Sequence, residues 1–144
     1  MIAKHSSIFL IVTILLTMLF GGCDKSAQDA ERMISSSEAL TDLDLRCSKI
    51  PKPDSFQFLR KDVSGNAWLD IIEYRFSSQM PFDSVKEFYS KWFHDHDWHS
   101  DSAFDSEKLK ELDFPVFFKE DVSISIGHAP FPGADYLISC SRKR

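Results

Sequence analysis

The feature that most limits what this chain can fold into is an apolar run over residues 8–20, which ends in Gly21-Gly22-Cys23. Two threonines interrupt the run, and Lys4 is the only formal charge before it. A charged start followed by a short apolar segment is the layout of a secretory signal. The run is too short for a membrane span, which needs about 20 apolar residues. We therefore expect residues 1–22 to be a signal peptide that is cleaved off.

The segment resembles the signal peptide and lipobox of bacterial lipoproteins. Gly21, Gly22 and Cys23 match that pattern, and Phe20 stands where leucine is commoner. The resemblance implies cleavage between Gly22 and Cys23, followed by attachment of acyl chains to Cys23. Two or three chains on one residue give a stable anchor, whereas a single chain gives only marginal binding. The alternative is an ordinary cleaved signal in which Cys23 carries no lipid.

The resemblance also implies a location. A lipoprotein of this kind is anchored in the cell envelope and faces the periplasm. In the family, an aspartate directly after the lipidated cysteine favours retention in the inner membrane. Asp24 fits that rule, and Lys25 behind it acts against it.

The charge of the chain argues against a nucleic-acid partner. Acidic residues number 22 and basic residues 17, which gives a net charge of −5. Nucleic-acid binding needs clustered lysine and arginine. Beyond the covalent acyl chains on Cys23, we expect no cofactor.

Two further cysteines, Cys47 and Cys140, lie near the two ends of the folding part. In an oxidising compartment such a pair is expected to form a disulfide. The alternative is two buried free thiols. Neither cysteine belongs to a Cys-x-x-Cys motif, so we do not expect a catalytic thiol.

The chain then divides into a tether and one small domain. Residues 23–44 comprise the lipidated cysteine and a segment without sustained periodicity, which predicts a flexible tether. A short helix over 27–34 is the alternative, but it would not be stable alone. Residues 45–144 are predicted to form a single domain, a length that suits one core.

The first half of this domain reads as a hairpin and a helix. Alternating apolar residues predict strands over 55–60 and 67–76, joined by a turn over 62–66. In the second strand one face is expected to carry the apolar side chains, namely Trp68, Ile72, Tyr74 and Phe76, with Asp70 interrupting it. Residues 81–95 predict the main helix, with Pro81 in its first turn and one broad apolar face.

The second half reads as sheet. A short helix is expected over 105–112, then an alternation of Phe114, Val116 and Phe118, and further strands over 122–126 and 135–141. Residues 127–133 predict a loop. The fold class is therefore α+β, with a two-layer arrangement: an antiparallel sheet of four to five strands and one main helix on one face.

One pattern resembles small periplasmic lipoprotein domains of the β-α-β-β type. Val85-x-x-Phe88-Tyr89, followed by Asp97-Trp98, carries this resemblance, which covers about residues 55–141. It implies no functional residues.

The densest polar cluster contains His94, His96 and His99. Imidazole and carboxylate groups bind metals, and His128 is a possible third ligand. The alternative is a solvated helix end, where cationic histidine is favoured by the helix dipole. A pH sensor is a further reading, since histidine titrates near neutrality.

Other features admit both structural and functional readings. Trp92, Phe93 and Trp98 line either a hydrophobic groove or the core. The basic tail, residues 142–144, either contacts anionic lipid headgroups or is a frayed terminus. No nucleophile elbow and no phosphate-binding glycine loop occurs in the sequence.

These observations favour a non-enzymatic, membrane-anchored lipoprotein whose domain binds another protein or an envelope component. One variant is an immunity-type lipoprotein that caps a toxin through an acidic patch. The alternative function is a metal-binding or metal-dependent protein that uses His94, His96 and His99. A third hypothesis is a site for a small apolar ligand between helix and sheet, which requires a cavity.

Overall fold

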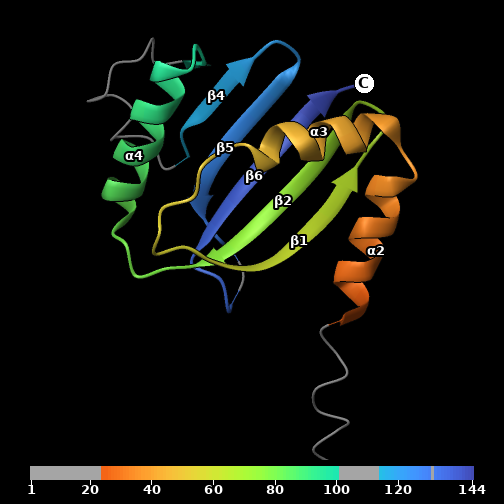
Figure 1. The fold of residues 1–144 in the computed structure, drawn as a ribbon, viewed down its shortest axis with the longest axis horizontal. Helices are drawn as coiled ribbons and strands as arrows, with labels where there is room; N and C mark the ends of the chain where they lie inside the picture. Colours follow the sequence, from red (N-terminus) through yellow and green to blue (C-terminus); the bar gives the residue numbers. More distant parts are fainter. Residues whose placement is uncertain (1–23, 101–113, 131) are drawn as a thin grey trace, which may run out of the picture.

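The computed structural model describes residues 24–100, 114–130 and 132–144, and over these residues the chain has an α+β fold (Figure 1). The helices are α2 (Asp24–Ser35), α3 (Glu38–Ser48) and α4 (Phe82–Asp95). The strands are β1 (Gln57–Gly65), β2 (Leu69–Ser77), β3 (His99–Ser100), β4 (Val116–Lys119), β5 (Val122–His128) and β6 (Tyr136–Lys143). The α+β class is confirmed, but the antiparallel sheet has six strands rather than four to five.

The sheet places the last strand of the chain near its middle. Its order is β1-β2-β6-β5-β4-β3, and every neighbouring pair is antiparallel. Side chains alternate between buried and partly exposed along β2, β5 and β6. The inward positions on these three strands are Ile72, Tyr74, Phe76, Val122, Ile124, Ile126, Tyr136, Ile138 and Cys140. The predicted alternation over 122–126 and 135–141 is confirmed.

The expectation of a flexible coil over residues 24–44 is wrong, because α2 and most of α3 occupy this segment. The sequence suggested that Ser35, Ser36 and Ser37 belong to a linker. In the structure these serines lie where α2 ends and α3 begins. The hydroxyls of Ser35 and Ser36 donate to carbonyl oxygens of the preceding turn, at 3.0 and 2.8 Å. The Ser37 hydroxyl then accepts from the amide of Leu40 at 3.4 Å and so caps α3.

These helices belong to the core. Ile34 of α2 is 5% exposed, and Leu40 and Leu43 of α3 are 7% and 0% exposed. All three belong to the same buried cluster as the inward residues of the sheet. Burial of this apolar stripe stabilises two short helices that would be marginal alone. The core therefore reaches back well before residue 45.

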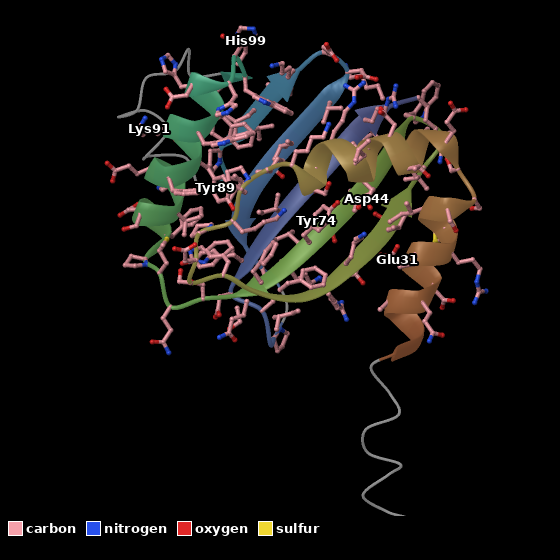
Figure 2. The ribbon with its side chains drawn as sticks, in the orientation of Figure 1. Glu31, Asp44, Tyr74, Tyr89, Lys91 and His99 are labelled. Carbon is pink, nitrogen blue, oxygen red and sulfur yellow. A yellow bond between two sulfur atoms is a disulfide. The ribbon has the colours of Figure 1, made fainter. Side chains whose placement is uncertain are left out.

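The main helix forms nearly where the sequence predicts it, over Phe82–Asp95. Val85, Tyr89 and Phe93 are completely buried, and Figure 2 shows Tyr89 on the side of α4 that faces the rest of the domain. Phe93 stacks on Phe117 with ring centroids 4.2 Å apart. The inward residue of β4 is therefore Phe117, whereas Phe118 on the neighbouring position is exposed. The helix expected over 105–112 lies outside the described residues.

The first hairpin turns later than predicted. Strand β1 continues to Gly65, and the turn is made at Asn66, whose side-chain oxygen accepts from the amides of Trp68 and Leu69 at 2.8 and 3.1 Å. Trp68 consequently leaves the inward face and is 77% exposed. Asp70 lies on the inward face, as the sequence predicts, and Arg144 donates to it at 2.6 and 2.9 Å.

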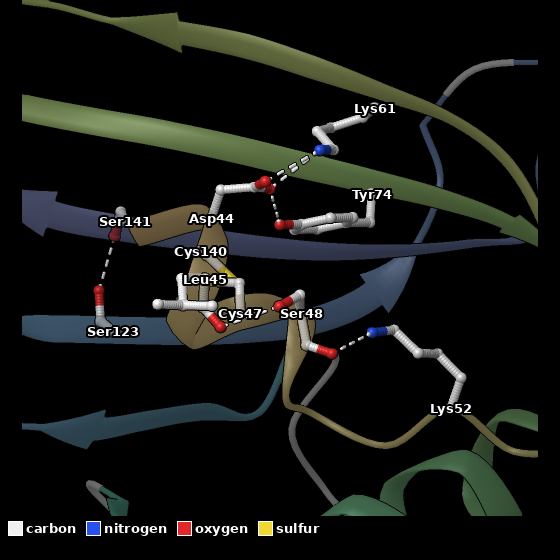
Figure 3. The surroundings of a disulfide bond; sticks show 10 residues. All are labelled: Asp44, Leu45, Cys47, Ser48, Lys52, Lys61, Tyr74, Ser123, Cys140 and Ser141. Atoms are coloured by element: carbon white, nitrogen blue, oxygen red, sulfur yellow. Dashed lines mark hydrogen bonds and ion pairs between the residues drawn. A yellow bond between two sulfur atoms is a disulfide. The ribbon is translucent and has the colours of Figure 1, made fainter. Parts of the chain in front are cut away.

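A disulfide joins Cys47 of α3 to Cys140 of β6 (Figure 3). The two Cα atoms are 6.4 Å apart, and both residues are buried. The bond ties α3 to a central strand of the sheet and spans 93 positions of sequence. Among the described helices, none has the length and apolar character that a membrane crossing requires.

Candidate functional site

A cleft of about 520 Å³ opens where the ends of three elements meet. We call it the tryptophan cleft, after Trp92 and Trp98. The end of α3 and the residue after it contribute to one wall, the end of α4 to another, and the β4–β5 turn to a third. Its lining residues are Arg46, Lys49, Trp92, His96, Trp98, Lys119, Glu120 and Val122. The volume falls within the range typical of ligand sites.

The two indoles that line the cleft pack against the hydrophobic core. Trp98 is 9% exposed and meets Phe93 edge-on, with ring centroids 5.1 Å apart. Its amide donates to the carbonyl of Phe93 at 2.9 Å, across a turn in which Asp97 adopts a φ of 60°. Trp92 is partly buried against the same cluster. The sequence left groove and core open for Trp92, Phe93 and Trp98. In the structure Phe93 lies wholly in the core, whereas Trp92 and Trp98 lie at the border of core and cleft.

The ring of His96 stacks against the indole of Trp92. The two rings are nearly parallel, with centroids 4.2 Å apart. The Nδ1 atom of His96 is 2.7 Å from the carbonyl oxygen of Trp92, which fixes the orientation of the imidazole. The side chain of His96 as a whole is exposed. Lys119 donates to the carbonyl of His96 at 2.8 Å and so ties the β4–β5 turn to the end of α4.

The rim of the cleft carries several cations although the chain is acidic overall. Arg46 lies 2.9 Å from Glu120, 3.0 Å from Asp42 and 3.5 Å from Asp121. Lys49 is exposed, and among the described residues no carboxylate lies within ion-pair distance of its ammonium. The rim therefore offers Lys49 to an external anion, while Arg46 is engaged within the protein.

Asp121 connects the rim to the C-terminal strand. Its carboxylate lies 2.5 Å from the guanidinium of Arg142. Burial acts to raise the pKa of Asp121, but a backbone hydrogen bond and the hydrogen bond from Arg142 outweigh it and hold that pKa below its usual value. Asp121 is therefore ionised at neutral pH and keeps the hairpin in place.

The structure places the histidines that the sequence grouped on different elements. His96 reaches the cleft, whereas His94 lies in the last turn of α4 and His99 in β3 (Figure 2). His128 packs on Phe82 at the opposite end of α4, with ring centroids 4.4 Å apart. Within the described ranges, no three His, Cys, Asp or Glu side chains are grouped so that they could hold a metal ion.

The basic tail is ordered rather than frayed. Arg142 contacts Asp42 at 3.0 Å as well as Asp121, and Arg144 binds Asp70. Two of its three cations therefore have acidic partners inside the domain. Lys143 remains exposed.

The chemistry that the cleft offers is recognition. Its described lining supplies two indoles, one imidazole, three cations and the carboxylate of Glu120, which pairs with Arg46. The exposed Lys49 beside the indoles suits an acidic group next to an apolar one. Sequence reasoning found Trp92, Trp98 and His96 but missed Arg46, Lys49 and Lys119. These cations are scattered over more than 70 positions, and only the fold brings them together.

No family model matches the chain, and comparisons with curated proteins and with solved structures likewise found no match.

Proposed function

We propose that this chain is a cell-envelope lipoprotein, anchored by acyl chains on Cys23, whose domain binds another protein or an envelope component. In this proposal the domain is not an enzyme. It faces the periplasm, and Asp24 favours the inner membrane. The binding surface is the tryptophan cleft.

The position of α2 supports the anchoring part of the proposal. The helix begins at Asp24, directly after Cys23, and its twelve residues are about 18 Å long. In Figure 1 the Asp24 end of α2 projects beyond the edge of the sheet. A lipid on Cys23 would therefore hold the domain off the bilayer on a helix, not on a coil.

The disulfide supports the proposed compartment. Disulfides persist in secreted and periplasmic proteins and are rare in the reducing cytosol. Cys47 and Cys140 are bonded and buried within the core. A periplasmic location would supply the oxidising conditions under which such a bond persists.

The single observation that carries the binding role is the composition of the tryptophan cleft. Tryptophan is enriched at the energetically dominant positions of protein interfaces, and here two tryptophans line one cleft next to the exposed Lys49. In Figure 1 the end of α4 lies opposite the Asp24 end of α2, so the cleft would point away from the membrane. We expect the partner to present a carboxylate beside an apolar side chain.

The charged groups that line the tryptophan cleft do not fit the immunity-type variant. That variant expects an acidic patch, whereas Arg46, Lys49 and Lys119 give the cleft cationic groups. An immunity function of that kind would therefore need a different surface of the domain.

A photoreactive amino acid placed at His96 tests the proposal in the envelope of the native cell. His96 is exposed within the cleft, and Glu87 is an exposed residue of α4 outside it. We expect a discrete crosslinked species from His96 and none from Glu87. Lys49→Glu should reduce recovery of that species about tenfold, because it reverses a charge at the rim.

The matched control is Lys143→Glu, which makes the same charge change at an exposed lysine outside the cleft. It should leave the crosslinked species unchanged. Equal crosslinking from His96 and Glu87, or equal losses in the two charge reversals, would contradict a specific partner at the cleft.

A further inference from the structure

A second opening of about 460 Å³ lies between the helices and the first two strands. We call it the Lys52 groove. Glu31 of α2, Ser48 at the end of α3, and residues of the following segment and of β1 and β2 surround it. Its lining residues are Glu31, Ser48, Lys52, Phe56, Phe58, Lys61, Tyr74 and Phe76. No residue of this groove lines the tryptophan cleft.

Aromatic rings form the floor of the groove. The ring of Phe76 lies 5.3 Å from that of Phe56 and 5.9 Å from that of Phe58, between centroids. Phe58 is 58% exposed, so a large apolar face meets water beside a concave surface. Covering exposed apolar surface of this kind with an apolar ligand group would favour binding, because that surface is removed from water.

One of the two lysines in the groove is already neutralised. Lys61 donates to Glu31 at 2.9 Å and to Asp44 at 3.1 Å. Asp44 also accepts a short hydrogen bond from the hydroxyl of Tyr74 (Figure 3). Two carboxylates thus more than offset the single charge of Lys61, and this network fixes the inner wall of the groove.

The other lysine has no such partner. The ammonium of Lys52 donates to the carbonyl of Ser48 at 3.2 Å and lies 5.8 Å from the centroid of the Tyr74 ring. Among the described residues, no carboxylate lies within ion-pair distance of it. Burial lowers the pKa of Lys52, and the nearby charge of Asp44 offsets only part of that effect. A partly desolvated ammonium that lacks a counter-ion would gain from a bound anion.

We propose that the Lys52 groove binds an amphipathic anion, a linear apolar chain that ends in a carboxylate or phosphate group. The head group receives hydrogen bonds from Lys52, whose two remaining N–H donors are not used by Ser48. The chain lies on Phe56 and Phe58. This site is separate from the tryptophan cleft, and its occupancy does not depend on the partner proposed above.

Photolabelling of the full-length protein in lipid nanodiscs tests this inference. The probes share one ten-carbon chain with a diazirine and differ only in their head group, which is carboxylate, phosphate, alcohol or trimethylammonium. We expect labelling at the peptide that contains Phe56 and Phe58, with at least about tenfold more from an anionic probe than from the alcohol. The cationic probe should label least. The stronger of the two anionic probes identifies the preferred head group.

Substitutions separate the role of Lys52 from that of the apolar floor. Lys52→Met should reduce labelling by the anionic probes to the level of the alcohol, and Lys52→Arg should retain most of it. Lys143→Met is the matched control, since Lys143 is an exposed lysine that lines neither the groove nor the tryptophan cleft, and it should leave the labelling unchanged. Equal labelling by all four head groups, labelling spread over other peptides, or anionic labelling that survives Lys52→Met would overturn the proposal.

Discussion

Replacing Cys47 and Cys140 together with alanine is expected to lower the free energy of unfolding by about 4–5 kcal/mol. The bond closes a loop across 93 positions, and in the chain-entropy model a loop of this size restricts the unfolded state by about that amount. Small domains have total stabilities of about 5–15 kcal/mol, so the loss is a large fraction of the whole. The bond also fixes α3 on β6, which no other covalent link in the described part of the chain does.

Urea denaturation of the purified full chain measures this effect. Reductant provides the control, because it should destabilise the native protein by a similar amount and leave the double variant unchanged. A loss below about 1 kcal/mol, or the same response to reductant in both proteins, would show that the bond does not support the fold.

Leu43→Ala is expected to cost about 2–5 kcal/mol, the range for removing a fully buried leucine side chain. Leu43 lies in α3 and is 0% exposed. It belongs to the same buried cluster as the inward residues of the sheet. Leu45, two positions along the same helix, is 56% exposed. Leu45→Ala should therefore change the free energy of unfolding by less than about 0.5 kcal/mol.

The two substitutions discriminate between a helix that belongs to the core and a tether outside it. Thermal and chemical denaturation of both variants give the required comparison. If residues 24–44 were a flexible tether, both leucine substitutions would have small and similar effects. A small effect of Leu43→Ala would therefore contradict the packing of α3.

The sheet and α4 were accessible from sequence because their signals are local. The alternation around Ile124 and Ile138 and the helical spacing of Val85, Tyr89 and Phe93 each repeat within a few residues. A helix within α2 was only a weak alternative from sequence, because so short a helix is not stable alone, and α3 was missed because serines interrupt the pattern. Those serines are caps, and the apolar positions of both helices become meaningful only against the sheet.

Neighbouring aromatic residues show a second limit of sequence reasoning. Phe117 and Phe118 are adjacent and chemically identical, and the contact with Phe93 of α4 decides which one turns inward. The prediction that Trp68 lies on the inward face was also wrong. The side chain of Asn66 accepts from the amide of Trp68 in the turn, and the indole is exposed to solvent. The burial of Phe117 depends on a tertiary contact, and the exposure of Trp68 depends on a hydrogen bond from a turn residue. A hydropathy pattern records neither interaction.

The two openings were hidden for a related reason. The tryptophan cleft draws its cations from α3, the residue after it and the β4–β5 turn, and these segments are far apart in sequence. Lys52 stands between two prolines and reads as an ordinary loop residue. Its burial and its position near Tyr74 appear only when the segment after α3 folds against β2.

The central claim is that an acylated Cys23 holds an oxidised domain at the membrane, and the intact mass of the native protein tests it most directly. Protein extracted from membranes without reductant should begin at Cys23 and carry the added mass of two or three acyl chains. Reduction should then add two hydrogens, from Cys47 and Cys140. A species that still begins at Met1, or one whose Cys23 sulfur is unmodified, would contradict the account.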